Sequence, residues 1–327
     1  GKNRRAAPVK GKSMKKSGNG IVGFVMLLIC AFIWGTSFVA QGTGMDHMGP
    51  FTFQSVRSFL GGAVLIPFIL ITKLIRKKNG TYEKESKKKR LRTLFVGVGC
   101  GSVLCVASCL QQFGINAGTD SGKAGFITAM YILIVPIFGL FMKKRVRPVM
   151  WVSIALGIVG LYFLCIHGAF TVMPSDALIM LCSVVFAVHI IMIDRFVPGL
   201  DGVKVSCIQF FTSATLSGIC MFIFEEPKLS QLTSGWFSLF YAGVMSCGIA
   251  YTLQILGQQR TEPAVASLVM SLESVFAVLG TIGYSMIIGE PDFPTAREWV
   301  GCALMFAAIV LSQLPVERWH AAVRRRA

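Results

Sequence analysis

One carboxyl group stands out in this sequence because it lies inside a long apolar stretch. Glu273 follows Glu262 by 11 residues, which on a helix is about 16 Å, near the middle of a bilayer core. An ionisable group at that depth is costly to keep there and is by default a functional candidate. It could bind and release a proton, or it could bond a hydroxyl or backbone group of a neighbouring helix. The residues alone leave both roles open.

Two cations lie in similarly apolar surroundings. Lys123 falls near the start of an expected helix, where it could hold a carboxylate or phosphate group of a ligand. Alternatively it pairs with Asp120 one turn earlier, a contact that stabilises a helix by only about 0.2–0.5 kcal/mol. Arg57 lies about 10 Å into another expected helix. We expect it to tie that helix to a neighbouring loop or helix end rather than to meet a ligand.

Uncharged polar and aromatic residues in apolar stretches are the next candidates. The amides of Gln111 and Gln254 could bond neighbouring helices or a polar ligand. His189 could titrate near neutral pH, although a neutral histidine bonded to a backbone carbonyl is the plainer interpretation. Three aromatic residues could stack on an aromatic or cationic ligand, or could simply pack: Trp34, Tyr131 and Tyr251.

The sequence contains no motif typical of catalysis or metal binding. It has no HExxH or GxSxG segment and no paired aspartates in an apolar stretch. Its ten cysteines fall in apolar runs and form no CxxC pair, which favours a packing role. The segment GTDSGK at 118–123 has three residues between its glycines, where a phosphate-binding loop needs four. We therefore expect no catalytic residue, no metal site and no cofactor.

The composition places these candidates in membrane helices. Of 327 residues, 54% are hydrophobic and only 14% are charged, against about 25% charged in soluble domains. The apolar runs can each cover the roughly 20 residues that a membrane helix needs, and none alternates as a barrel strand would. The ten expected spans are 20–42, 50–72, 93–114, 119–142, 149–168, 174–194, 203–224, 236–258, 262–288 and 296–316.

The distribution of basic residues predicts the orientation of these helices. The net charge is +17, and 28 of the Lys and Arg residues lie on the side of the two termini, against three on the other side. Because cytoplasmic loops carry the excess of Lys and Arg, both termini are predicted to be cytoplasmic. The tails, 1–19 and 317–327, are expected to be basic. The clusters flank the spans, so the expected partner is the lipid bilayer and not a nucleic acid.

The two halves of the chain resemble each other in order. Cys30 onward (CAFIWGTSFV) aligns with Cys182 onward (CSVVFAVHII), and Leu110-Gln111 aligns with Leu253-Gln254. Thr119 and Thr261 then open corresponding spans. We expect an all-α integral membrane protein of ten transmembrane helices with one repeat at 20–168 and the other at 174–316. Because each repeat has five spans, the second would be inverted, an arrangement found in alternating-access carriers.

Several segments resemble the EamA-type branch of the drug/metabolite transporter superfamily. They are FIWGTSF at 32–38, RSFL at 57–60, TDSGKAGFI at 119–127 with Val135-Pro136, ASL at 266–268, LESVF at 272–276 and Gly289-Glu290. The resemblance implies two inverted five-helix halves around a central cavity and the movement of small metabolites. One departure is Ser274, because span nine of the family usually has proline after its Leu-Glu.

The expected function is a secondary transporter for an amino acid or similar polar organic solute, or a drug, acting by alternating access. It is expected in a plasma membrane, specifically a bacterial inner membrane, as a monomer or a homodimer. If transport is coupled to protons, Glu273 is the residue expected to bind and release the proton. A membrane-embedded enzyme and a channel-like protein are the alternatives, and flux into liposomes separates them: saturable exchange, a covalent product or unsaturable conductance.

The topology is testable by cysteine labelling. We expect a cysteine at Thr81 to react only with reagent that reaches the cytoplasm, and a cysteine at Thr233 to react from outside, because an odd number of expected spans separates them. An impermeant maleimide applied to intact cells and then to permeabilised cells makes the measurement. Labelling of both positions from the same side would contradict the ten-span arrangement.

Overall fold

The computed structural model describes residues 18–119, 121–144, 146–166, 173–288 and 293–314, and these form helices joined by short connections. Most of the predicted tail 1–19, all of the tail 317–327, and Asp120 therefore lie outside the described residues. The helices are α1 (Gly18–Met45), α2 (Pro50–Lys78), α3 (Lys87–Asn116), α4 (Ser121–Thr128), α5 (Tyr131–Phe141), α6 (Pro148–Cys165), α7 (Pro174–Phe196), α8 (Gly202–Phe224), α9 (Leu229–Ser234), α10 (Trp236–Phe240), the π-helical segment η1 (Tyr241–Ala250), α11 (Tyr251–Gln258), α12 (Pro263–Met270), α13 (Glu273–Ile288) and α14 (Ala296–Gln313).

The helical class predicted from the sequence is confirmed, and within the described residues there is no β-strand. Eight helical segments are long and apolar enough to cross a membrane. They are Gly20–Phe38, Pro50–Lys78, Lys87–Asn116, Lys123–Phe141, Pro148–Cys165, Pro174–Phe196, Gly202–Phe224 and Trp236–Gln258. A shorter apolar helical segment covers Pro263–Leu279, and the last expected span is helical as α14.

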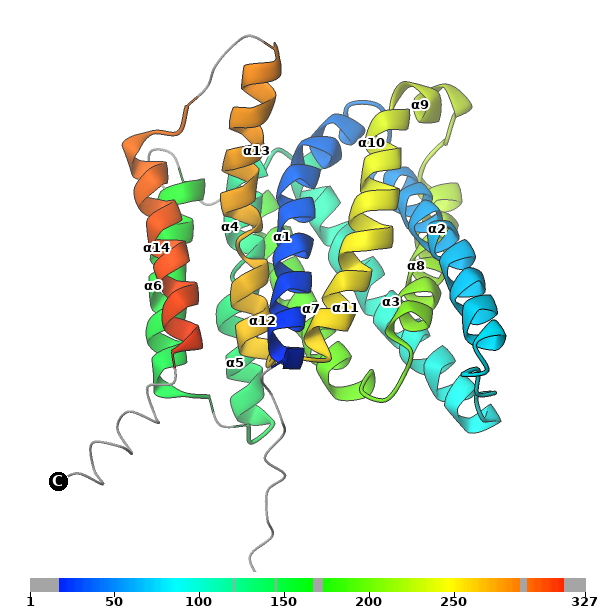
Figure 1. Ribbon diagram of the computed structural model, residues 1–327. Helices are drawn as coiled ribbons and strands as arrows, with labels where there is room; N and C mark the ends of the chain where they lie inside the picture. Colours follow the sequence, from blue (N-terminus) through cyan, green and yellow to red (C-terminus); the bar gives the residue numbers. More distant parts are fainter. Residues whose placement is uncertain (1–17, 120, 145, 167–172, 289–292, 315–327) are drawn as a thin grey trace, which may run out of the picture.

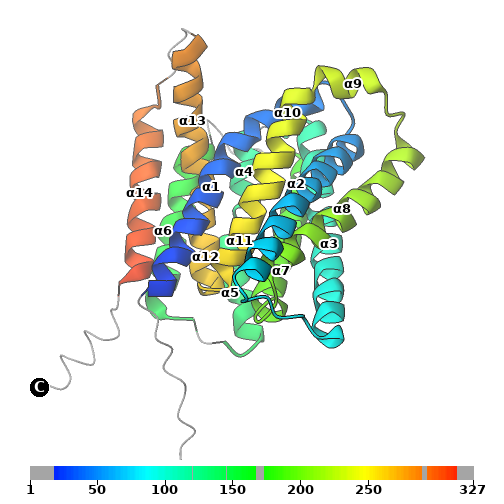
Figure 2. The ribbon, with the colours of Figure 1, turned by 45° about the vertical axis from the view of Figure 1, so that its right-hand side comes forward.

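The helices pack side by side in one bundle. At one edge α6 and α14 lie against each other, and at the other edge α8 packs between α2 and α3 (Figure 1). Between these edges stand α1, α7, α11 and the α12–α13 pair, and the turned view keeps α6 beside α14 (Figure 2). Helix α1 begins and α14 ends at the same end of the bundle, where the α2–α3 loop also lies (Figure 1).

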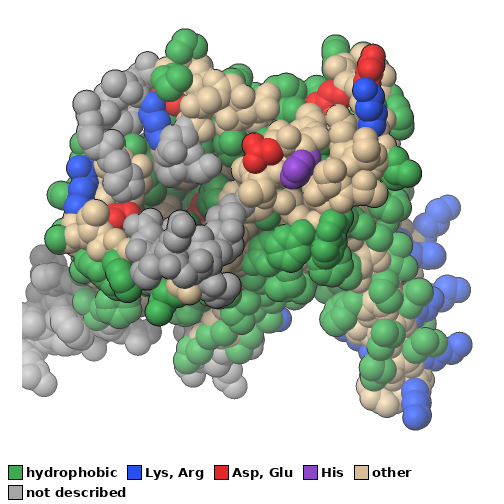
Figure 3. All heavy atoms as spheres, turned by 90° about the horizontal axis from the view of Figure 1, so that it is seen from above, with side chains coloured by type: hydrophobic (Ala, Val, Ile, Leu, Met, Phe, Trp, Pro, Cys, Tyr) green, Lys and Arg blue, Asp and Glu red, His purple; other side chains and the backbone are tan. Residues whose placement is uncertain are grey.

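The two ends of the bundle differ in charge. The end with the α2–α3 loop carries the basic run of α2, α3 and their connection, including Arg76, Lys77 and Lys78 in the last turn of α2. Basic side chains at a helix carboxyl terminus complement the helix dipole. The opposite end, which carries α9, presents mostly apolar and uncharged side chains, with scattered charges of both signs (Figure 3).

Two of the predicted spans are interrupted near their middle. Span 119–142 divides into α4 and α5 at Ala129-Met130, and span 262–288 divides into α12 and α13 at Ser271-Leu272. Pro136 lies inside α5 and not at the interruption. The second interruption forms although Ser274 replaces the proline that the related family usually has there.

Hydroxyl groups hold the interrupted backbones. Ser183 of α7 donates to the carbonyl of Thr128 at the end of α4 (2.9 Å), and Ser271 donates to the carbonyl of Leu268 (2.7 Å). Such partners are needed because a released carbonyl in an apolar layer has no water to bond. Helix α1 passes close to the second interruption, since a Cβ on Gly35 would lie 2.5 Å from the carbonyl oxygen of Glu273. Only glycine allows that approach.

Candidate functional site

A cavity lies in the interior of the bundle where the two interrupted helices meet α1, α2, α3, α7 and the η1–α11 segment. Its lining is formed by Trp34, Phe38, Gln41, Arg57, Gln111, Thr128, Tyr131, Phe186, Ile190, Ser246, Tyr251, Gln254, Met270 and Glu273. Seven of the nine candidate residues chosen from the sequence are in this set. The two that are not are Lys123 and His189.

Glu273 and Tyr131 meet at the interruptions. Tyr131 is the first residue of α5 and Glu273 is the first residue of α13, so the two occupy corresponding positions, 142 residues apart. Tyr131 Oη donates a hydrogen bond to Glu273 Oε1 (3.3 Å). Both side chains are buried, Glu273 with 5% of its surface exposed. The amino terminus of α13 also favours a negative charge at this position.

Arg57 supplies a buried positive charge on the α2 side of the cavity. Its side chain is 4% exposed, and its Nε donates to Gln54 Oε1 (2.7 Å) while Nη1 donates to Gln41 Oε1 (3.1 Å). The guanidinium also lies over the ring of Phe53, 5.1 Å from its centroid. Arg57 therefore ties α2 to α1, as one reading of the sequence predicted, and it also lines the cavity.

Arg57 and Glu273 do not neutralise each other. No carboxylate of the described residues lies within ion-pair distance of Arg57, and Arg57 Nη2 and Glu273 Oε2 make no hydrogen bond there. Two further polar atoms, Trp34 Nε1 and Gln254 Oε1, are buried without a partner among the described residues. Buried polar groups are normally bonded. The cavity thus offers donors and acceptors that the protein itself leaves unused.

The rest of the cavity wall is largely aromatic and apolar. The rings of Trp34 and Tyr251 lie 4.6 Å apart between centroids at a tilt of 59°, and Phe38 and Phe186 add further aromatic surface. Gln111 Nε2 donates to Thr128 Oγ1 (3.1 Å), so this amide bonds a neighbouring helix and also faces the cavity. A few polar groups on an apolar wall is the usual construction of a small-molecule site.

Lys123 lies away from the cavity. Its Nζ forms an ion pair with Asp176 Oδ2 (2.5 Å), and Asp176 also accepts from Thr119 Oγ1 (3.1 Å) and from the backbone N–H of Met173 (2.7 Å). This carboxylate is 1% exposed. The described partner of Lys123 is thus on α7, and Asp120, the neighbour that the sequence suggested, lies outside the described residues. The lysine joins α4 to the start of α7 and does not line the cavity.

His189 is packed behind the cavity wall. It is fully buried, its ring lies 6.4 Å from that of Tyr251 in an edge-on arrangement, and its Nε2 bonds Gln209 Oε1 (3.2 Å). Its partner is therefore a side-chain amide rather than the backbone carbonyl expected from the sequence. Its place behind Tyr251 favours a packing role.

The sequence reasoning missed the two amides that hold Arg57 in place. Gln41 and Gln54 accept from the guanidinium, and Gln112 Nε2 donates to Gln41 Oε1 (2.6 Å). A usable signal was present, because each is a glutamine within or beside an apolar stretch. Gln112 follows Gln111, and neighbours on a helix point in different directions. The sequence analysis named Gln111, which lines the cavity, and did not name Gln112.

Comparison with known proteins assigns a family to this bundle. The model of the EamA-like transporter family matches residues 21–166 and again residues 173–314. The chain belongs to the EamA-like transporter family. As the sequence resemblance indicated, it is a multi-pass membrane transporter of the drug/metabolite transporter superfamily.

Relatives of this transporter occur in archaea and bacteria. An uncharacterized transporter of Archaeoglobus fulgidus is 27% identical over 291 residues, covering 89% of this chain and 85% of the relative. The uncharacterized inner membrane transporter YedA of Escherichia coli is 24% identical over 295 residues, covering 89% and 90%. The aromatic amino acid exporter YddG of Ancylobacter novellus is 24% identical over 205 residues, covering 60% and 68%.

A solved crystal structure has the same fold as this transporter. The two superpose with a TM-score of 0.69 at 20% sequence identity, over 91% of this chain and 98% of the other. At that identity the likeness concerns the fold alone, which agrees with the helical bundle described above.

The Lys123–Asp176 pair predicts a stability effect without a binding effect. Asp176→Ala should lower the free energy of unfolding by on the order of 3 kcal/mol, because it removes a buried carboxylate that bonds Lys123, Thr119 and the backbone of Met173. Lys123→Ala should have the same direction, and solute affinity should be unchanged in whatever fraction folds. Thermal unfolding and solute titration of the purified variants test this, with Lys78→Ala as an exposed charge control. Weakened solute affinity at full thermal stability would instead place Lys123 in the binding site.

Proposed function

We propose that this protein is a secondary transporter for a small zwitterionic solute of the amino-acid type, with an apolar or aromatic side chain. The observation that carries the proposal is that Arg57 and Glu273 line one cavity without pairing with each other. A buried charge without a counter-charge is unfavourable. A solute with both a carboxylate and an ammonium group would satisfy the two charges together.

Each end of such a solute has a suitable partner. A carboxylate would accept a charge-assisted hydrogen bond from Arg57 Nη2, because Nε and Nη1 already donate to Gln54 and Gln41. An ammonium group would donate to Glu273 and to the unused Gln254 Oε1. The aromatic wall around Trp34 and Tyr251 would receive the apolar side chain. A cationic drug would leave Arg57 without a counter-charge, so the geometry favours the amino-acid class.

One relative supports this substrate class by its name. YddG of Ancylobacter novellus is an aromatic amino acid exporter, and the match covers 60% of this chain. The cavity here has the aromatic surface that a solute of this kind would contact.

We further infer an alternating-access mechanism between two inverted halves, 20–168 and 174–316, with ten membrane crossings. Three observations support it. The family model matches the chain twice in succession. The fourth and ninth expected spans are interrupted at corresponding places, since α4 and α12 have eight residues each and a two-residue break follows both. The cavity lies where these interruptions meet, as in carriers built from inverted repeats with broken helices.

The side of the membrane follows from the basic residues. Helix α1 begins and α14 ends at the bundle end that carries the α2–α3 loop (Figure 1). Since Lys and Arg are concentrated in cytoplasmic loops, we place that end and both termini in the cytoplasm. The membrane would be the plasma membrane, as for the relative named as an inner membrane transporter.

Glu273 is also the residue that would couple transport to protons. Its carboxylate can hold a proton or the ammonium group of the solute, but a protonated carboxyl no longer attracts the cation. The two ligands would therefore exclude each other at Glu273. Such competition exchanges protons for solute across the membrane without a further coupling site.

The zwitterion proposal is tested by the chemistry of the ligand. Phenylalanine or leucine should raise the melting temperature of the purified transporter, because a ligand that binds the folded state stabilises it by mass action. The N-acetyl derivative and the methyl ester, each lacking one charge, should bind at least about tenfold more weakly, since a charged hydrogen bond is worth about 1.5–3 kcal/mol. Arg57→Gln should remove the distinction between the amino acid and its ester.

This design does not depend on the folding of a variant. The derivatives are compared on the unaltered protein, and Arg57→Lys keeps the charge while losing the planar guanidinium geometry. Equal stabilisation by the amino acid, its ester and its N-acetyl form would rule out recognition of both charges. Stabilisation by hydrophobic cations alone would favour a drug transporter.

The coupling proposal predicts a pH-dependent affinity. In the unaltered protein, solute affinity should fall as the pH is lowered, because protonation of Glu273 removes the negative charge that holds the ammonium group. In Glu273→Gln the affinity should be weaker and independent of pH, and a pH gradient should no longer drive solute into proteoliposomes. Solute exchange at equal pH should persist in this variant at high solute concentration.

The structural alternative gives a different result. If Glu273 only bonds Tyr131, the glutamine variant should bind solute and respond to a pH gradient normally, because an amide preserves that hydrogen bond. Glu273→Ala should then lower the folded yield by leaving a buried partner unsatisfied. Tyr131→Phe, which removes the hydroxyl and keeps the carboxyl, distinguishes the hydrogen bond from the charge.

A further inference from the structure

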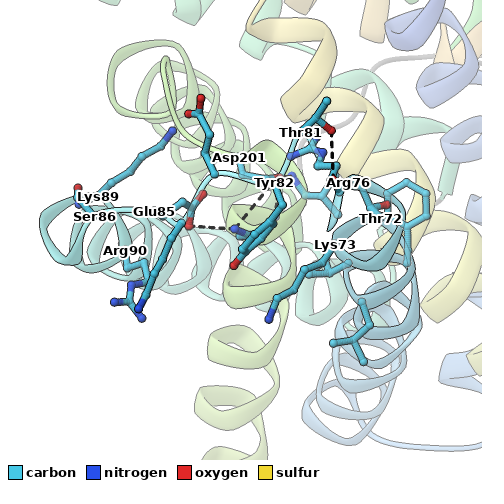
Figure 4. Close-up of a pocket in the computed structure, with 17 residues that line it drawn as sticks. Thr72, Lys73, Arg76, Thr81, Tyr82, Glu85, Ser86, Lys89, Arg90 and Asp201 are labelled. Carbon is cyan, nitrogen blue, oxygen red and sulfur yellow. Dashed lines mark hydrogen bonds and ion pairs between the residues drawn. The ribbon is translucent and has the colours of Figure 1, made fainter. Parts of the chain in front are cut away.

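A second pocket lies at the basic end of the bundle, remote from the central cavity. It is formed by the carboxyl-terminal part of α2, the loop between α2 and α3, the amino terminus of α3 and the start of α8 (Figure 4). Its lining reaches from Phe68 to Arg76 on α2, which is about 12 Å along the helix axis. The pocket therefore extends from the apolar surface of α2 to its charged end.

Cations outnumber carboxylates two to one in this pocket. The cations are Lys73, Arg76, Lys84, Lys89, Arg90 and Lys204. The carboxylates are Glu83, Glu85 and Asp201, and two of these already face Lys204, at 2.9 Å from Glu85 and 3.9 Å from Asp201. Among the described residues no ion pair engages Arg76, Lys89 or Arg90. The pocket retains an unbalanced positive charge.

The first turn of α3 adds to this charge. It reads Lys87-Lys88-Lys89-Arg90 and contains no acidic residue. A helix amino terminus already carries partial positive charge, so four basic residues there destabilise an isolated helix. The arrangement becomes favourable when an anion binds beside it.

One wall of the pocket is apolar and continuous with the lipid-facing surface. Phe68 and Leu70 line the pocket and have 55% and 51% of their surfaces exposed. On α3, Leu94 and Phe95 are also exposed. A dissolved inorganic anion would gain nothing from contact with this apolar wall. A phospholipid does, because its phosphate lies at the depth of the basic residues and its acyl chains lie at the depth of the apolar ones.

We propose that this pocket binds the headgroup of an anionic phospholipid from the surrounding leaflet. The phosphate lies among Arg76, Lys89 and Arg90 near the amino terminus of α3, and the acyl chains run along Phe68 and Leu70. The bound lipid joins the ends of α2, α3 and α8. This inference does not depend on the transported solute or on proton coupling.

The test compares two double variants of the same helical turn. Lys89→Gln with Arg90→Gln removes two charges from the pocket, and Lys87→Gln with Lys88→Gln removes two charges from the same turn outside it. Dioctanoyl phosphatidylglycerol is titrated into the full-length protein in neutral detergent, and binding is followed by native mass spectrometry and melting temperature. Dioctanoyl phosphatidylcholine is the uncharged control.

We expect the pocket variant to bind phosphatidylglycerol about tenfold more weakly, and the outside variant to change by less than about twofold. Phe68→Ser should weaken the binding of phosphatidylglycerol and leave the affinity for glycerol 1-phosphate unchanged. If the two double variants lost equal affinity for phosphatidylglycerol, the lipid would be attracted to the basic end in general, and the proposed binding pocket would be ruled out. Glycerol 1-phosphate binding as tightly as the lipid would identify a site for a free anion and overturn the lipid assignment.

Discussion

The structure depends on one constraint: polar backbone groups within an apolar layer must find their partners inside the protein. Two helices are interrupted in the interior of this bundle, at Ala129-Met130 and at Ser271-Leu272, and each interruption releases backbone groups there. Hydroxyl groups of Ser183 and Ser271 bond the carbonyls beside the breaks. The interruptions also place Tyr131 and Glu273 at the starts of their second halves, so that side chains from distant parts of the chain meet.

A network of hydrogen bonds stabilises the buried charge of Arg57 near these interruptions. Gln41 and Gln54 each accept from Arg57, and Gln112 donates to Gln41, so the guanidinium is held although no described carboxylate pairs with it. Neutral hydrogen bonds offset only part of the cost of burying a charge. The remaining cost is a reason for a charged ligand to bind, because binding then relieves an electrostatic penalty in addition to burying apolar surface. Contacts with the aromatic wall would add affinity for a solute independently of its charge, and the charges of Arg57 and Glu273 would fix the orientation of the solute in the cavity.

The sequence could predict the residues of this cavity better than their contacts. An ionisable or amide group in an apolar stretch is expensive wherever it lies, so Glu273, Arg57, Gln111 and Gln254 were identifiable by type and depth alone. For Lys123 the sequence shows only neighbours along the chain, so it could not indicate Asp176, the described partner on another helix. The alignment of the two halves singled out Gln111, which lines the cavity, but gave no role to its neighbour Gln112, which bonds Gln41. The interruptions were also unreadable: Pro136 lies in a continuous helix, and the break before Glu273 forms without a proline.

The contacts of α7 restrict how this bundle could change shape. At one end of α7, Asp176 pairs with Lys123 of α4, and at the other end Asp194 pairs with Lys144, just after α5. In the middle, Ser183 of α7 bonds the carbonyl that ends α4. Helix α7 and the interrupted α4–α5 segment are therefore joined at three levels and should move together. The α12–α13 segment packs against α5 and α7 of this unit, and at the cavity the Tyr131–Glu273 hydrogen bond, at 3.3 Å, joins the two. A solute that binds the carboxylate of Glu273 in place of Tyr131 would remove that hydrogen bond, which lies at the interruption of the second half.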